Sequence, residues 1–240
     1  MNVLSNYYKN LNYSYDNASN NFFIQEDFDK NDLKKSLKLF NEESIRIKKP
    51  SPKNLEVYAL LSGISFDIEL RTKLFNIQNL IKQIIPKNIA YFVIPKNFGL
   101  EHCVFNWPNQ KWNFNKENIV NRFIDLYNFK SFNLEIKGIQ IHTDGCIIAK
   151  GFDKSMEMIK IRNFFEKNLD FYPKKQSKWS HIPLGRILEP IGEVNYKALK
   201  KFAKDYKNKN ITSAKIINYK FIHETKWYME EKKIIKLINV

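Results

Sequence analysis

Glycine, proline and cysteine are scarce in this chain, and it has no long apolar run. Its 240 residues include 7 glycines and 8 prolines, which argues against a long flexible linker. The two cysteines, Cys103 and Cys146, are far apart and lack the spacing of zinc ligands, so we expect neither a disulfide framework nor a metal site. No run reaches the roughly 18 apolar residues that a membrane span requires. The first residues also lack a basic segment followed by an apolar one, so we expect a soluble, cytoplasmic protein with no membrane partner.

Hydrophobic and aromatic residues are plentiful, and the charge is strongly positive. Hydrophobic residues make up 43% of the chain and aromatic residues 15%, enough for one sizeable core or two packed lobes and too many for a disordered chain. The formal net charge is +15, and a basic surface suits a polyanion such as RNA. A low-GC genome would also favour this composition, because lysine, asparagine, isoleucine, tyrosine and phenylalanine have AT-rich codons. The charge therefore leaves nucleic-acid binding and codon bias both open.

The first 53 residues differ from the rest and are expected to form a partly helical N-terminal extension. Asn, Tyr, Ser and Asp dominate up to about Asn21, and residues 29–47 have the weak amphipathic spacing of a helix. The segment Lys48-Lys-Pro-Ser-Pro-Lys53 interrupts that helix and marks a boundary. We expect residues 54–240 to form one two-lobed domain.

The remaining residues show the same order of elements twice: a strand, a helix, a strand that contains a histidine, and a second helix. The predicted strands cover residues 57–66, 90–94, 100–107, 132–141, 146–152, 180–188, 211–224 and 226–238, and the predicted helices cover 67–85, 116–127, 155–169 and 193–206. The repetition predicts an internal duplication. We expect an α/β (α+β) fold of two lobes about a pseudo-twofold axis, with two sheets around a central groove and helices outside.

The two repeated histidines, His102 and His181, each lie in an apolar, strand-like run. Because side chains alternate along a strand, we expect His102 to share a face with Val104, and burial of Ile182 and Leu184 to turn His181 toward the groove. Imidazole titrates near neutrality, so one ring can act as general base and the other as general acid on a phosphodiester. The alternative is that each histidine is a packed, hydrogen-bonded residue, the commoner role for a lone histidine in an apolar strand.

The other two histidines, His142 and His223, lie at predicted strand ends. We expect His142 to be structural or solvated and His223 to be packed, with a groove-lining position as the alternative for His223. Lys174, Lys175 and Lys178 precede the His181 strand. They form either a guide for a phosphate backbone or a solvated loop.

Three segments carry a family resemblance. Ser180-His-Ile-Pro-Leu-Gly-Arg-Ile187 looks like a second histidine motif, Phe92 to His102 like the approach to a first, and Glu224 to Tyr228 like a closing hairpin. In this order and spacing the chain resembles the two-histidine (2H) phosphoesterase superfamily, which includes the 2′-5′ RNA ligase and cyclic phosphodiesterase family. The resemblance covers about residues 55–240.

The resemblance implies the duplicated, bilobal fold and a metal-independent phosphodiesterase that uses no cofactor. His102 and His181 would be the acid–base pair. The substrate would be an RNA, an oligonucleotide or a cyclic nucleotide, cut at a 2′,3′-cyclic phosphate or a 2′-5′ linkage.

The chain departs from this family two residues after each histidine, where Val104 and Pro183 replace the family's Thr or Ser. Those hydroxyls hold phosphate oxygens in the family, and a hydrogen bond to a charged group is worth about 1.5–3 kcal/mol. Candidates to bind the phosphate instead are Arg186, Tyr228, Lys178 and Ser180.

The departures leave a second hypothesis open, a catalytically impaired RNA- or nucleotide-binding protein on the same fold. A third hypothesis is an interaction protein whose extension recruits a partner.

Overall fold

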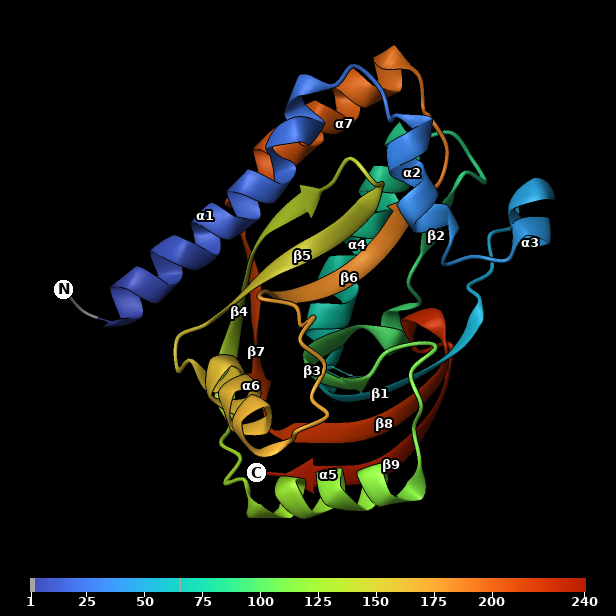
Figure 1. The fold of residues 1–240 in the computed structure, drawn as a ribbon. Helices are drawn as coiled ribbons and strands as arrows, with labels where there is room; N and C mark the ends of the chain where they lie inside the picture. The colour runs from blue at the N-terminus through green and yellow to red at the C-terminus, as the bar shows by residue number, and fades with distance from the viewer. Residues whose placement is uncertain (1–2, 65) are drawn as a thin grey trace.

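The computed structural model describes residues 3–64 and 66–240, which form two antiparallel sheets with helices around them (Figure 1). The first sheet has the order β3-β1-β8-β9 and the second β2-β6-β5-β4-β7. The strands of the first sheet are β1 (Asn54–Gly63), β3 (Gly99–Asn106), β8 (Asn218–Lys226) and β9 (Glu231–Asn239). Those of the second are β2 (Ala90–Phe92), β4 (Phe132–Ile141), β5 (Cys146–Asp153), β6 (Ser180–Ile187) and β7 (Asn210–Ile216).

The predicted internal duplication is visible in the strand pairing. β1 pairs antiparallel with β3, and β5 pairs antiparallel with β6, so each histidine strand pairs with the strand that opens its repeat. The helix between them contacts the opposite sheet in each case: α4 (Ile68–Ile84) contacts β6 and β7, and α6 (Glu157–Asn168) contacts β3. The expected two-lobed fold is therefore confirmed.

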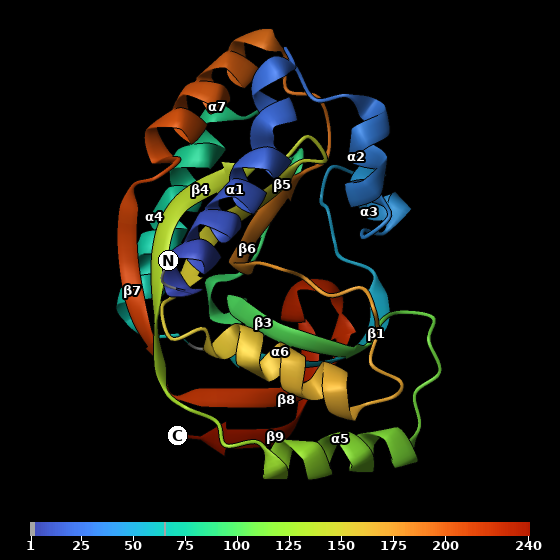
Figure 2. The same cartoon turned by 60° about the vertical axis from the view of Figure 1, so that its left-hand side comes forward.

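The helices that cover the sheets follow the apolar spacing of the sequence. α4 begins after Asp67, whose carboxylate accepts a hydrogen bond from the Leu70 backbone N–H and caps the helix. Its apolar side packs with that of α7 (Glu193–Tyr206) in the main core. α5 (Phe114–Leu126) and α6 cover the outer side of the first sheet (Figure 2). None of the helices in the described ranges is long and apolar enough to span a membrane.

Some predicted elements are divided in the structure. The helix expected over 29–47 is two short helices, α2 (Lys30–Leu37) and α3 (Glu42–Arg46), because Phe40 between them pairs with Pro52 and turns the chain. The strand expected over 211–224 is divided at Ile217 into β7 and β8, which belong to different sheets.

The extension also contains a helix that the sequence analysis did not predict, α1 (Val3–Ile24). α1 and α2 lie over the face of the second sheet opposite α4 and α7 (Figures 1 and 2). Tyr15 of α1 is fully buried, and its hydroxyl donates to the Gly151 carbonyl. After α1, both Asp27 carboxylate oxygens accept hydrogen bonds from the backbone N–H groups of Ile191 and Gly192, at the start of α7. These contacts join the extension to the fold.

Candidate functional site

The two histidine strands meet at one guanidinium group. β3 of the first sheet contacts β6 of the second, and Arg162 of α6 lies at their junction. Its Nε donates to the His102 carbonyl at 2.6 Å, and its NH2 donates to the Trp179 carbonyl at 2.9 Å and to the Glu101 carbonyl at 3.2 Å. Arg162 was missed in the sequence, because it is one arginine within an ordinary amphipathic helix. It ties the two strands together just where they carry the candidate histidines.

His102 lies at a β-bulge of β3. Leu60 of β1 pairs with Cys103 and Leu61 pairs with Glu101, so His102 is an extra residue without a direct partner. A bulge interrupts the alternation of faces. The His102 ring lies 5.0 Å from the ring of Tyr219 and 6.2 Å from that of Phe132, both members of the main core.

Val104 packs on the other face of the same sheet, in a separate cluster with Ala59 and Ile222. The prediction that His102 and Val104 share a face is therefore wrong. The physical reason is the bulge, which sequence alternation cannot reveal.

The environment of His102 keeps its ring neutral. Nε2 lies 2.8 Å from Ser62 Oγ, and Ser62 donates its own hydrogen to the Asn218 carbonyl at 2.7 Å. The serine oxygen must therefore accept from Nε2–H, which leaves Nδ1 as the unprotonated nitrogen. Nδ1 is buried, and no partner for it occurs in the described part of the chain. Burial, followed by the charge of Arg162, lowers the His102 pKa to about 3.

His181 follows the alternation that the sequence predicts. Ile182 and Leu184 are buried in the main core, and His181 and Pro183 lie on the opposite face of β6. That face is covered by the extension. The neighbouring Ile148, which pairs with Pro183, packs against Leu11 and Tyr15 of α1.

The ring of His181 is also neutral. It lies 5.8 Å from the ring of Trp179, whose indole N–H donates to Ser14 Oγ of α1 at 2.8 Å. Burial, helped by His142 and Arg162, lowers the His181 pKa to about 3. Neither histidine is therefore protonated near pH 7.

Arg186 and Tyr228 are brought together. Arg186 Nε donates to the Tyr228 hydroxyl at 2.6 Å, and its NH1 donates to Ser36 Oγ at 2.6 Å and to Asp144 Oδ2 at 3.1 Å. The Tyr228 ring lies 5.1 Å from that of Tyr91. The guanidinium thus joins β6, the extension and the connection between β8 and β9, and most of its donors bind protein groups.

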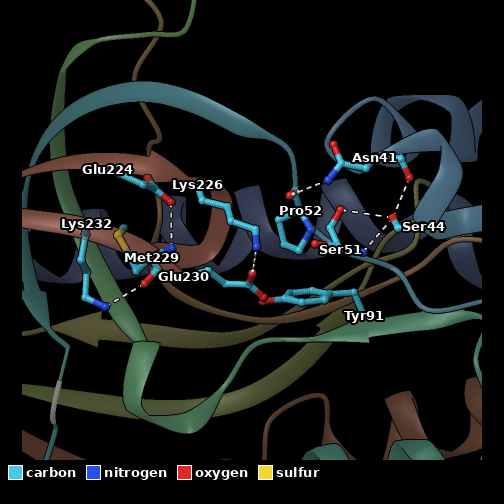
Figure 3. Close-up of polar contacts among 10 residues, drawn as sticks. All are labelled: Asn41, Ser44, Ser51, Pro52, Tyr91, Glu224, Lys226, Met229, Glu230 and Lys232. Carbon is cyan, nitrogen blue, oxygen red and sulfur yellow. Dashed lines mark hydrogen bonds and ion pairs between the residues drawn. The ribbon is translucent and has the colours of Figure 1, made fainter.

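Tyr228 has a left-handed backbone (φ +63°) in the short helix η2 (Trp227–Met229), and polar contacts hold this connection in place (Figure 3). Glu224 Oε1 accepts from the Met229 backbone N–H at 2.9 Å, and Lys232 donates to the Met229 carbonyl at 2.7 Å. Glu230 pairs with Lys226 at 2.9 Å and accepts from the Tyr91 hydroxyl at 2.8 Å. Both ends of the loop are therefore anchored around Tyr228.

Ser180 and Lys178 take different positions. Ser180 is fully buried, and its backbone N–H donates to the Tyr15 hydroxyl at 3.1 Å. Lys178 is exposed and lines a cavity of about 420 Å³ between α1, α6 and the loop before β6. Lys174, Arg162 and Ser177 also line this cavity. The cavity thus has three cations beside the junction of the histidine strands.

No protein-family model matches the chain, and no curated protein matches its sequence. Solved structures do match. The crystal structure of Escherichia coli LigT in apo form has a TM-score of 0.54 at 11% identity, and the match covers 78% of this chain and 98% of LigT. E. coli LigT complexed with 3′-AMP has a TM-score of 0.52 at 11% identity, covering 78% and 99%.

TT0787 of Thermus thermophilus has a TM-score of 0.53 at 11% identity, with 76% of this chain and 97% of TT0787 covered. A structure described as a phosphoesterase gives 0.51 at 10% identity. At these identities the likeness establishes the fold alone.

Proposed function

We propose that this chain, whose fold is that of the two-histidine phosphoesterases, binds the phosphates of an RNA or nucleotide and does not perform paired-histidine catalysis. The observation that carries this proposal is the position of His102. Its ring is hydrogen-bonded to Ser62 on the helix-covered side of the first sheet, away from Val104.

Acid–base catalysis by two histidines needs one neutral and one protonated ring near the working pH. A ring with a pKa of about 3 is protonated in roughly one molecule in ten thousand at pH 7. Val104 and Pro183 also lack the hydroxyl that would hold a phosphate oxygen. The chain therefore lacks both the protonated acid and the phosphate-orienting hydroxyls that paired-histidine catalysis requires.

Binding is supported by charge and shape. The net charge is +15, and the cavity beside α6 is lined by Arg162, Lys174 and Lys178 against one acidic residue, Glu166. Phosphate oxygens suit such cations. The solved LigT structures include complexes with 3′-AMP, ATP and phosphate, which supports a nucleotide-type ligand for the fold. We place the ligand phosphate of this chain at Lys174 and Lys178.

The second candidate is a metal-independent phosphodiesterase that cuts an RNA 2′ phosphodiester, with His102 and His181 as the acid–base pair. It is favoured by the junction at Arg162, which holds the two histidine strands together, and by the phosphoesterase among the similar structures. It requires β3 to lose its bulge, so that His102 turns toward the face of Val104.

One experiment separates the two. RNA ending in a 2′,3′-cyclic phosphate and 2′-5′-linked oligoadenylate are incubated with the protein in EDTA, and turnover and binding by fluorescence anisotropy are both measured. We expect binding without turnover. Replacing Lys174 and Lys178 with alanine should weaken binding at least about tenfold, because two phosphate contacts are lost. The matched control replaces Lys201 and Lys204, which are exposed on α7 far along the chain.

Turnover that falls at least about a hundredfold in both His102→Ala and His181→Ala would overturn the binding proposal and establish the phosphodiesterase. If the protein shows no turnover and no binding, this result would favour the third hypothesis, the interaction protein. That hypothesis predicts that a partner binds through the extension, residues 1–53.

A further inference from the structure

The turn between β4 and β5 brings three metal-binding side chains together. His142, Asp144 and Cys146 each offer a ligand atom, and these atoms all lie within 4.8 Å of one another. A nitrogen, a carboxylate oxygen and a sulfur are the donor types that zinc prefers in proteins. The cluster lies on the opposite side of Arg186 from Tyr228.

The backbone holds these residues in place. The His142 N–H donates to the Cys146 carbonyl at 2.9 Å, and the Gly145 N–H donates to the His142 carbonyl at 2.9 Å, which closes the turn. Gly145 has φ +82°, and a Cβ there would lie 2.0 Å from the Ile187 carbonyl oxygen, so only glycine fits. The three side chains stand at alternate positions of a rigid turn.

Each donor has free capacity. His142 Nε2 is buried, and the described residues offer it no hydrogen-bond partner. Cys146 is a free cysteine. Asp144 accepts from the Cys146 backbone N–H through Oδ1 and from Arg186 through Oδ2, both at 3.1 Å, which orients the carboxylate and leaves one lone pair on each oxygen.

The charges also suit a dication. Burial raises the pKa of the Cys146 thiol, so a metal ion has to displace its proton on binding; the thiolate and the Asp144 carboxylate then outnumber the one guanidinium of Arg186. Arg186 acts as the outer partner that orients the carboxylate, the role that second partners play at metal sites.

We propose that His142, Asp144 and Cys146 form a binding site for Zn²⁺ or a similar soft divalent cation, with a fourth coordination position open to water. A search for paired cysteines misses this site, because its ligands are spaced His-x-Asp-x-Cys with a single cysteine.

Co²⁺ serves as the probe, because thiolate ligation produces a charge-transfer absorption band in the near ultraviolet. The full chain, purified with EDTA and then freed of it, is titrated with Co²⁺ and afterwards with Zn²⁺. We expect the band to appear at one equivalent of cobalt and to disappear when zinc displaces it. Cys146→Ser should abolish the band, and His142→Gln should weaken zinc binding at least about tenfold.

The matched control is Cys103→Ser, which removes the other cysteine and should keep the band. Circular dichroism verifies that each variant is folded. Absence of the band in the folded parent protein would overturn the proposal. So would a band that persists in Cys146→Ser or is lost in a folded Cys103→Ser.

Discussion

Ser62 on β1 accepts a hydrogen bond from His102 Nε2 at 2.8 Å and donates one to the Asn218 carbonyl at 2.7 Å, so one hydroxyl links three strands of the first sheet. A histidine that the sequence presents as a catalyst is thereby part of a buried polar chain. Its contribution to stability can be measured.

Ser62→Ala should destabilise the protein by about 1–3 kcal/mol, because it leaves the buried His102 Nε2–H and the Asn218 carbonyl without their partner. Urea unfolding followed by circular dichroism gives the free energy of unfolding. Ser213→Ala, at an exposed position of β7, is the control and should cost less. Equal effects of the two substitutions would refute the polar chain.

Tyr15→Phe should destabilise the protein by about 1–3 kcal/mol, since it removes the acceptor of the buried Ser180 N–H and the donor to the Gly151 carbonyl. Tyr13→Phe makes the same chemical change two residues away, at a side chain that is 72% exposed. It should change the unfolding free energy by less than about 0.5 kcal/mol. If both variants unfold alike, α1 does not pack on the second sheet as described.

The lowered pKa values of His102 and His181 predict that the free energy of unfolding falls in acid. Burial holds both folded-state pKa values at about 3, below the unfolded value of ~6.5, so the unfolded chain binds more protons between these values. The stabilisation is complete above about pH 6.5 and is lost as the pH falls toward 3, with a slope of about 1.4 kcal/mol per pH unit for each histidine.

The measurement is the free energy of unfolding in urea from pH 7 to pH 4.5 for the parent and His181→Gln. His181→Gln should have a shallower pH dependence than the parent. A slope unchanged by His181→Gln would contradict the lowered pKa of the partly buried His181 ring.

The raised pKa of Glu224 predicts that stability falls as the pH rises, the opposite trend to that of the histidines. Burial, with the nearby Glu101 carboxylate, raises the Glu224 pKa to about 8 against an unfolded value of ~4.3. The folded protein binds more protons between these values, so this stability is complete below about pH 4.3 and is lost as the pH rises through 8.

Glu224→Gln keeps an oxygen that can accept from the Met229 N–H but cannot ionise. We expect it to raise Tm relative to the parent at pH 8.5 more than at pH 5. An equal Tm difference at the two pH values would mean that Glu224 does not ionise in this range.

Much of the secondary structure could be predicted from apolar spacing. The helix predicted over 193–206 is α7, and the strand predicted over 132–141 is β4, with the same bounds. α1 was missed because polar residues surround its buried positions. Leu11, Tyr15 and Phe22 nevertheless stand four and seven residues apart, a helical spacing that was present in the sequence.

The site could be predicted only in part. The sequence identified the two histidine strands and gave Arg186 and Tyr228 as separate candidates for phosphate binding. The structure brings these two side chains to 2.6 Å. Arg162 and the cluster at His142 could not be found in this way. Their partners are backbone carbonyls or side chains on a turn, which no residue pattern marks as a pair.

The sequence by itself determined most of the order of the strands and helices after residue 53, the duplication and the residue types at each candidate position, because these depend on local periodicity and composition. Only the tertiary structure decided which face His102 occupies and what covers the face of His181. One bulge at His102 turns that ring into the core, and packing of the extension covers the face of His181. Bulges and long-range packing arise from the pairing of distant strands and helices, so no local pattern specifies them.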